Sequence, residues 1–263
     1  MMSGVPIGGT IASLIGLGVI SRWGWRPMFL VALVALVVLV PLAVKVLPPD
    51  RPERAPREHT ETVSGFKALL RPPFLVVSIL FAVATIVTLM AWYGLGTWIT
   101  NLLQIAGYDL AQALVITLTL NLGAVAGSIV TAWAGDRFGT VPTGVVAAAI
   151  AGAALLVLLT HPPLAIVYVA MVLAGVGTHG TQCLIIAAIA TYFPDRLRGT
   201  ALGWGLGVGR IGAVLAPQAG GWLLAATSND PNSNFLLFGV SALVSAAMLL
   251  GIWKGFPVTH DER

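Results

Sequence analysis

Long apolar stretches recur along almost the whole chain, and they restrict its possible folds more than any other feature of the sequence. The hydrocarbon core of a bilayer is about 30 Å thick and a helix rises about 1.5 Å per residue, so about 20 apolar residues span it. The pattern predicts an all-α integral membrane protein with about eight transmembrane helices, or seven if the short first stretch does not span. The eight stretches lie at approximately 4–20, 28–47, 74–100, 111–133, 141–160, 164–190, 200–226 and 235–253.

Composition supports the membrane assignment and excludes several classes of function. Of 263 residues, 57% are hydrophobic and 9% are charged, against about 25% charged in soluble domains. The 14 Lys and Arg lie between the apolar stretches rather than in a basic patch, so we do not expect nucleic-acid binding. The sequence contains no HExxH or GxSxG motif, and we predict neither an enzyme, a metal site nor a cofactor. Gly207, Gly209 and Gly212 have dinucleotide-motif spacing, but within an apolar stretch they indicate helix packing.

The basic residues predict how the chain is oriented, because Lys and Arg are retained on the cytoplasmic side of a membrane. They occur in alternate connections, at 48–73, 134–140, 191–199 and in the C-terminal tail. The connections at 99–110, 161–163 and 228–234 contain none, and only Arg22 and Arg26 break the alternation. We therefore expect an inner-membrane protein, surrounded by lipid bilayer, with both termini in the cytoplasm.

The connection 48–73 divides the chain, because it is long, polar and proline-rich whereas the others are short. Two predicted spans precede it in 1–47 and six follow it in 74–263. Many transporter folds consist of two six-helix halves joined by a long cytoplasmic connection. In such a fold, 1–47 would hold the last two helices of an N-terminal half whose other four helices are missing.

Arg210 is the most informative candidate for a functional site, because it lies near the middle of an apolar stretch. An arginine at the centre of a membrane costs at least ~2.5 kcal/mol, so it needs a partner or a wet cavity. The predicted spans contain no Asp or Glu. A substrate carboxylate fits best, since the guanidinium group binds it with two hydrogen bonds. The alternatives are a counter-charge in a missing segment and a structural arginine that binds helix carbonyls.

Other polar and aromatic residues within the apolar stretches could line a cavity. His179 and Gln182 lie three residues apart, so they share one helix face, and they could relay protons or equally well form interhelical hydrogen bonds. Asn121, Trp92 and Tyr93 could present an amide and aromatic rings to a substrate, or serve packing and the interface. Pro217 is expected to kink or break its helix.

Several segments together resemble the major facilitator superfamily and, within it, the aromatic acid:proton symporter group. They are GWRPMF, the polar connection 48–73, GDRFG at Gly135–Gly139, FPDRLRGTALGW and GVGRIGAVLAP. The resemblance implies helices five to twelve of the fold, without the first four and their acidic proton-coupling motif. The sequence differs from the family where TVPT follows GDRFG in place of basic residues.

The resemblance implies proton-driven uptake of an aromatic or other organic carboxylate by a truncated chain. Arg210 would hold the anion, with His179, Gln182, Asn121, Tyr93 and Trp92 around it. A conformational motif would comprise Gly135, Asp136, Arg137, Gly139 and Arg198. Two alternatives remain open: an exporter of drugs or metabolites from the same superfamily, and a non-transporting membrane scaffold or sensor.

Overall fold

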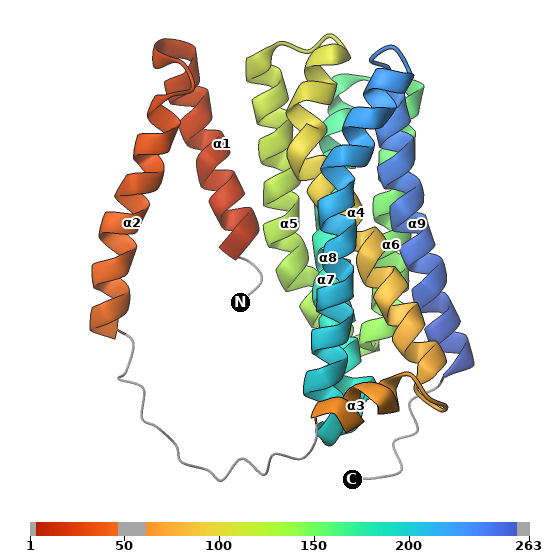
Figure 1. Cartoon of the computed structure of the whole chain (residues 1–263). Coiled ribbons are helices and arrows are strands. Elements are labelled where there is room, and N and C mark those ends of the chain that lie inside the picture. The colour runs from red at the N-terminus through yellow and green to blue at the C-terminus, as the bar shows by residue number, and fades with distance from the viewer. Residues whose placement is uncertain (1–3, 47–61, 257–263) are drawn as a thin grey trace.

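The computed structural model describes residues 4–46 and 62–256, and within them it contains helices and no strand. The helices are α1 (Gly4–Trp23), α2 (Pro27–Val46), α3 (Thr62–Leu69), α4 (Leu75–Ile105), α5 (Leu110–Phe138), α6 (Thr140–Val157), the short 3-10 helix η1 (Leu158–Thr160), α7 (Leu164–Tyr192), α8 (Asp195–Ala226) and α9 (Pro231–Gly255) (Figure 1). The eight longest correspond in order to the eight predicted spans.

The helix ends differ from the prediction, because several helices continue beyond their apolar stretches. The segment expected as the connection 99–110 is helical as far as Ile105, and α5 includes most of the expected connection 134–140. α8 begins at Asp195, so it includes most of the connection expected before residue 200. The hydrophobic pattern marks only the membrane-embedded part of a helix, whereas backbone hydrogen bonding continues until a residue leaves the helical conformation. In α5 this residue is Gly139, whose φ of +93° ends the helix.

Five of the described helices are long and apolar enough to cross a membrane: α4, α5, α6 with η1, α7 and α9. In α1 and α2 the apolar segments found are shorter, at Pro6–Ile20 and Leu36–Val46. α8 is longer than any of these helices, yet its many glycines and Arg210 lower its hydropathy. Its place in the bundle, rather than its apolarity, indicates that it crosses the membrane with its neighbours.

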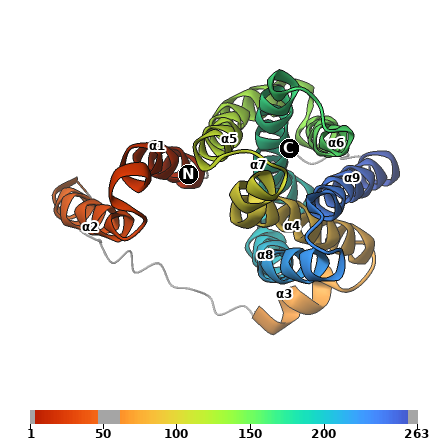
Figure 2. The same cartoon turned by 90° about the horizontal axis from the view of Figure 1, so that it is seen from above.

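Helices α4 to α9 form one bundle, and α1 and α2 form a hairpin beside it (Figures 1 and 2). α1 lies next to α5, and α2 lies on the far side of α1 from the bundle (Figure 2). α5 packs closely on α7, since a Cβ at Gly127 would lie 2.6 Å from Cα of Val176. A small residue at this position therefore allows the two helices to pack closely.

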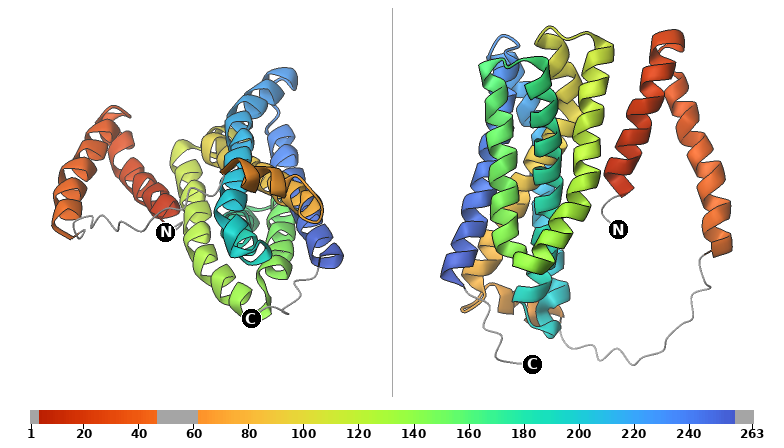
Figure 3. Two further views of the ribbon diagram at one scale, coloured as in Figure 1. Left: turned by 60° about the horizontal axis from the view of Figure 1, so that its bottom comes forward. Right: turned by 180° about the vertical axis from the view of Figure 1, so that it is seen from behind.

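α3 is a short helix that the sequence analysis did not predict within the connection 48–73. It lies across one end of the bundle, beneath α8 (Figure 3), and Phe66 packs edge-on against Trp204 with ring centroids 5.4 Å apart. Residues 47–61 of the connection, with three of its arginines, lie outside the described residues. The part of the connection nearest α4 is therefore attached to the bundle rather than free.

α8 presents glycines on two sides, and only one side is packed. A Cβ at Gly212 would lie 2.7 Å from the carbonyl carbon of Ile86 on α4, so these two helices nearly touch. Gly203 and Gly207 instead have open space around them. Of the kink or break predicted at Pro217, the break does not occur, because α8 is continuous through this residue. The Trp98 indole of α4 donates a hydrogen bond to the Pro217 carbonyl at 3.0 Å.

Candidate polar site between α4, α7 and α8

Arg210 lies at the middle of α8, and its guanidinium group donates a hydrogen bond to the hydroxyl of Tyr93 on α4. The two atoms, Nη1 and Oη, are 2.9 Å apart. Arg210 is exposed and Tyr93 is half-buried, so the pair lies at the surface of the bundle rather than inside it. Two residues that the sequence analysis had proposed independently are therefore neighbours.

The close approach of α4 and α8 places this pair. Close to Arg210 in sequence, Gly209 and Gly212 of α8 allow the backbone of α4 to pack directly against α8. A Cβ at Gly209 would lie 3.1 Å from Cβ of Thr85, which is tighter than ordinary contact. Two helices this close bring side chains at the edge of their interface within hydrogen-bonding distance of each other, and a tyrosine hydroxyl can both accept from the arginine and donate to a further group.

Trp92 and His179 form a second pair beside the first. The Trp92 indole of α4 lies against the imidazole of His179 on α7, with ring centroids 5.0 Å apart and planes inclined by 49°. His179 is buried, with 3% of its surface exposed. Since Trp92 and Tyr93 are adjacent in α4, this helix connects the buried histidine of α7 with the exposed arginine of α8.

Gln182 lies one turn after His179 in α7 and is also buried, with 3% of its surface exposed. Neither its amide nitrogen nor its amide oxygen has a hydrogen-bond partner among the described residues. A buried polar group without a partner costs about 1–3 kcal/mol. The neighbouring Thr178 is satisfied locally, because its hydroxyl donates to the carbonyl of Ala174. Among the described residues, Gln182 and the adjacent Thr181 hydroxyl are therefore buried groups of this region with unused hydrogen-bonding capacity.

Asn121 lies elsewhere, at the contact between α1 and α5. Its amide nitrogen donates to the Thr117 carbonyl at 3.0 Å. A Cβ at Gly9 of α1 would lie 2.9 Å from Cγ of Asn121, so the side chain packs directly against α1. The structure thus gives Asn121 a helix-packing contact and does not bring it together with Arg210.

Four of the five residues of the predicted conformational motif lie where α5 meets α6. Gly135 is buried, and a Cβ there would lie 2.6 Å from Cδ2 of Leu184 on α7. Asp136 is exposed, and Gly139 ends the helix. The guanidinium group of Arg137 lies over the rings of Trp133 and Phe138, at 5.9 and 5.8 Å from their centroids.

Arg198, the fifth member of that motif, pairs within its own helix. Its Nη2 lies 2.7 Å from Oδ1 of Asp195, and both side chains are largely exposed. An exposed pair of this kind contributes about 0–1 kcal/mol. The structure therefore gives Arg198 a local partner in the first turn of α8.

The sequence analysis missed two interhelical hydrogen bonds that fix the surroundings of the site. The hydroxyls of Thr88 on α4 and Ser245 on α9 lie 2.7 Å apart in a buried position. The Trp98 indole donates to the carbonyl of Pro217 across the α4–α8 contact. The available signal was the presence of a hydroxyl residue and a tryptophan inside apolar stretches, but their partners are 157 and 119 residues away in sequence.

Comparison with known proteins relates this geometry to a family. The sequence matches the model of the Major Facilitator Superfamily over residues 1–130 and 85–262. It is 58% identical over 269 residues to a gentisate transporter of Corynebacterium glutamicum, covering 99% of this chain and 60% of that protein. It is 30% identical to a benzoate transport protein of Acinetobacter baylyi, covering 86% of this chain and 54% of that protein.

A solved structure agrees on the fold. The crystal structure of a D-xylose-proton symporter superposes with a TM-score of 0.70 at 16% identity, covering 99% of this chain and 63% of that protein. The chain thus spans less than two thirds of the length of each of these proteins. It is a multi-pass membrane protein with a partial form of their fold, and it belongs to the Major Facilitator Superfamily.

Proposed function

We propose that this chain is part of a secondary transporter that takes up an aromatic carboxylate together with a proton. The observation that carries the proposal is the pair formed by Arg210 and Tyr93, at the middle of α8 and on the exposed side of the α4–α8 contact. The guanidinium group has a phenol as its partner here rather than a carboxylate, so its charge is available to an anion. A carboxylate is the anion whose geometry the guanidinium group matches best.

The aromatic part of the substrate class is supported by two aromatic residues of α4, one of which is the partner of Arg210. Trp92 and Tyr93 supply two adjacent aromatic side chains, and Trp92 already packs against the imidazole of His179. Aromatic rings pack well against one another at centroid distances of 4.5–7 Å. The names of the two relatives, which refer to gentisate and benzoate, point to the same class. Gln182 would hydrogen-bond a polar substituent of the ring or a water molecule.

His179 would couple transport to protons, because it would bind the proton that is taken up with the substrate. An imidazole changes its charge near physiological pH, and His179 lies within the bundle next to the aromatic residues of the site. Protonation of this residue would favour binding of an anion nearby. We propose His179 as the proton-binding group supplied by this chain.

We propose an orientation in which the end of α5, with Arg137, and the start of α8, with Arg196 and Arg198, face the cytoplasm. The end of α9 lies at that same end of the bundle, whereas α1 begins about midway along the bundle (Figure 1). The alternation of basic residues along the chain supports the proposal that both termini are cytoplasmic. Gly135 to Gly139, with Arg198, would act there as the motif that changes contacts when the transporter opens. The open side of α8, with Gly203 and Gly207, would pack against helices matching the part of the relatives that this chain does not cover.

Uptake of radiolabelled benzoate and gentisate tests the proposal, in cells that express either this chain or a version extended by the upstream helices of the relatives. We expect the cells to take up at least one of these labelled acids, and we expect a protonophore to abolish this uptake. Arg210→Ala should raise KM about 10- to 100-fold, since a charge-assisted hydrogen bond contributes about 1.5–3 kcal/mol. Tyr93→Phe should raise it by less than tenfold, because it removes one neutral hydroxyl.

Arg196→Ala is the matched control, since it removes an exposed arginine from the first turn of the same helix. His179→Gln should retain exchange of labelled for unlabelled substrate while losing accumulation driven by the proton gradient. An unchanged KM in Arg210→Ala would contradict the anion-binding role. Counterflow of organic cations rather than carboxylates would instead indicate an exporter of the same superfamily.

A further inference from the structure

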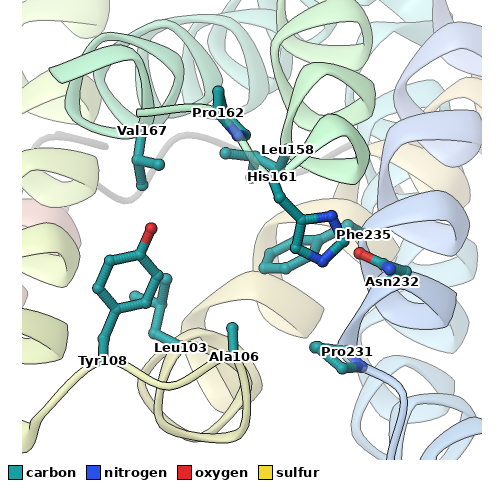
Figure 4. Close-up of a pocket in the computed structure, with 10 residues that line it drawn as sticks. All are labelled: Leu103, Ala106, Tyr108, Leu158, His161, Pro162, Val167, Pro231, Asn232 and Phe235. Atoms are coloured by element: carbon teal, nitrogen blue, oxygen red, sulfur yellow. The ribbon is translucent and has the colours of Figure 1, made fainter. Parts of the chain in front are cut away.

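A pocket lies at the opposite end of the bundle from Arg137, Arg196 and Arg198. The connections that join α4 to α5 and α6 to α7 meet the first turns of α9 there, around a volume of about 150 Å³. Figure 4 shows the pocket, with Tyr108 of the first connection and His161 of the second on opposite sides of it. None of the residues proposed from the sequence lines it.

The pocket is separate from the Arg210 site. Leu103 is the residue of α4 that lines the pocket, and it follows Tyr93 by ten residues in the same helix. At about 1.5 Å per residue, the two positions are about 15 Å apart along the helix axis. A molecule the size of one aromatic ring could not occupy both sites at once.

The walls of the pocket are apolar and well packed. Leu103, Leu158, Val167 and Phe235 line it and are buried, so they form part of the hydrophobic core beneath the connections. An apolar cavity of about 150 Å³ is large enough to hold benzene. The size and lining of the pocket therefore match a single aromatic ring.

Polar groups occupy the rim. Tyr108, His161 and Asn232 bring a phenol, an imidazole and an amide to the pocket (Figure 4). No hydrogen bond joins these three side chains to any other residue in the described part of the chain. A hydroxyl or carboxyl substituent of a ring in the pocket could thus form hydrogen bonds with these three side chains.

The backbone holds the rim in place before any ligand binds. His161 has a left-handed conformation with φ of +50°, which is costly for a residue with a side chain, and its N–H donates to the Leu158 carbonyl. Two prolines follow it directly. On the other side Asp230 caps α9 by accepting from the N–H of Asn232. A preformed site loses less conformational entropy on binding.

We propose that this pocket binds a small molecule with one aromatic ring that carries a hydroxyl or carboxyl group. The ring packs against Phe235 and the aliphatic residues, and its substituent hydrogen-bonds with His161 and with Asn232 or Tyr108. The site itself does not depend on transport. If the proposed orientation holds, however, this end of the bundle faces outward, and an aromatic acid approaching from outside meets this pocket before the Arg210 site.

Saturation-transfer NMR on the purified chain in detergent tests the proposal with phenol and benzoate as probes and acetate as the control. The Arg210→Ala background removes the contribution of the central site. We expect saturable binding of phenol, benzoate or both, and none of acetate. The probe that binds identifies the substituent that the rim accepts.

Two substitutions locate the binding. Ala106→Phe places a ring in the pocket that Ala106 lines and should abolish the signal. Ala226→Phe adds the same ring to an exposed position at the end of α8, outside the pocket, and should leave it unchanged. His161→Ala, on an exposed turn, should weaken binding about tenfold, as expected for the loss of one hydrogen bond.

The proposal is overturned if the folded chain, eluting as a single species in size-exclusion chromatography, binds neither phenol nor benzoate. It is equally overturned if Ala106→Phe and Ala226→Phe retain binding alike, or if His161→Ala binds as tightly as the parent. Because the readout is binding rather than uptake, a failure of the transport proposal leaves this result unaffected, and the reverse also holds.

Discussion

Substitution of Gly212 by alanine tests the closest helix contact in the site. The added Cβ would overlap the carbonyl oxygen of Ile86 and lie 2.7 Å from its carbonyl carbon, where ordinary contact begins at 3.4 Å. Both atoms belong to the backbone of α4, so no side chain can rotate away. The helices must separate by several tenths of an ångström or more, along the contact that places Tyr93 next to Arg210. We expect a cost of about 2 kcal/mol, within the range for overpacked cores.

Gly203→Ala is the matched control, because it adds the same methyl group to the same helix at a position with nothing within 4 Å. Alanine is the better helix former, so this variant should be at least as stable as the parent. Thermal unfolding of the purified chain in one detergent, followed by tryptophan fluorescence, compares the two. For a domain of about this size 2 kcal/mol corresponds to a fall of about 4–8 °C in Tm. Equal Tm values for both variants would refute the close approach of α4 and α8.

Three further predictions concern contacts around the site. Thr88→Val should cost about 1 kcal/mol, because it leaves the buried Ser245 hydroxyl without its interhelical partner; thermal unfolding should show that adding Ser245→Ala restores part of the loss. Trp98→Phe should lower Tm by a few degrees by removing the indole donor to a carbonyl of α8, whereas Trp222→Phe, at a residue 68% exposed, should not; similar Tm values would contradict the role of that bond. Phe66→Ala should release α3 from α8 and speed proteolysis within α3, and an unchanged cleavage rate would argue against this docking.

The sequence was sufficient to locate the long helices and to place Arg210 deep within one of them. Both conclusions depend on local properties, namely the length of an apolar stretch and the position of one charge within it. The sequence was a less reliable guide to the helix ends, because backbone hydrogen bonding continues beyond the apolar stretch. α4 extends to Ile105 and α8 begins at Asp195 for this reason. The sequence analysis also missed α3, whose eight residues are too few to stand out in a polar connection.

Partners were harder to predict than positions. Tyr93 and Arg210 were both candidates, but they are 117 residues apart, and only the packing of α4 on α8 makes them neighbours. Asn121 was a candidate on the same grounds, yet it packs against α1. In a helix surrounded by other helices and by lipid, hydrophobicity no longer distinguishes the inner face from the outer one. The direction of each side chain is therefore not visible in the sequence.

The sequence by itself determined that the protein lies in a membrane, that its fold is all-α, and that Arg210 lies near the middle of a helix. It could do so because the bilayer fixes how long and how apolar a spanning helix must be. Only the tertiary structure decided which residues meet: the Arg210–Tyr93 pair, the Trp92–His179 contact and the pocket formed by two connections and the start of α9. These contacts depend on how closely neighbouring helices approach, which is set by the shapes of side chains far apart in the chain.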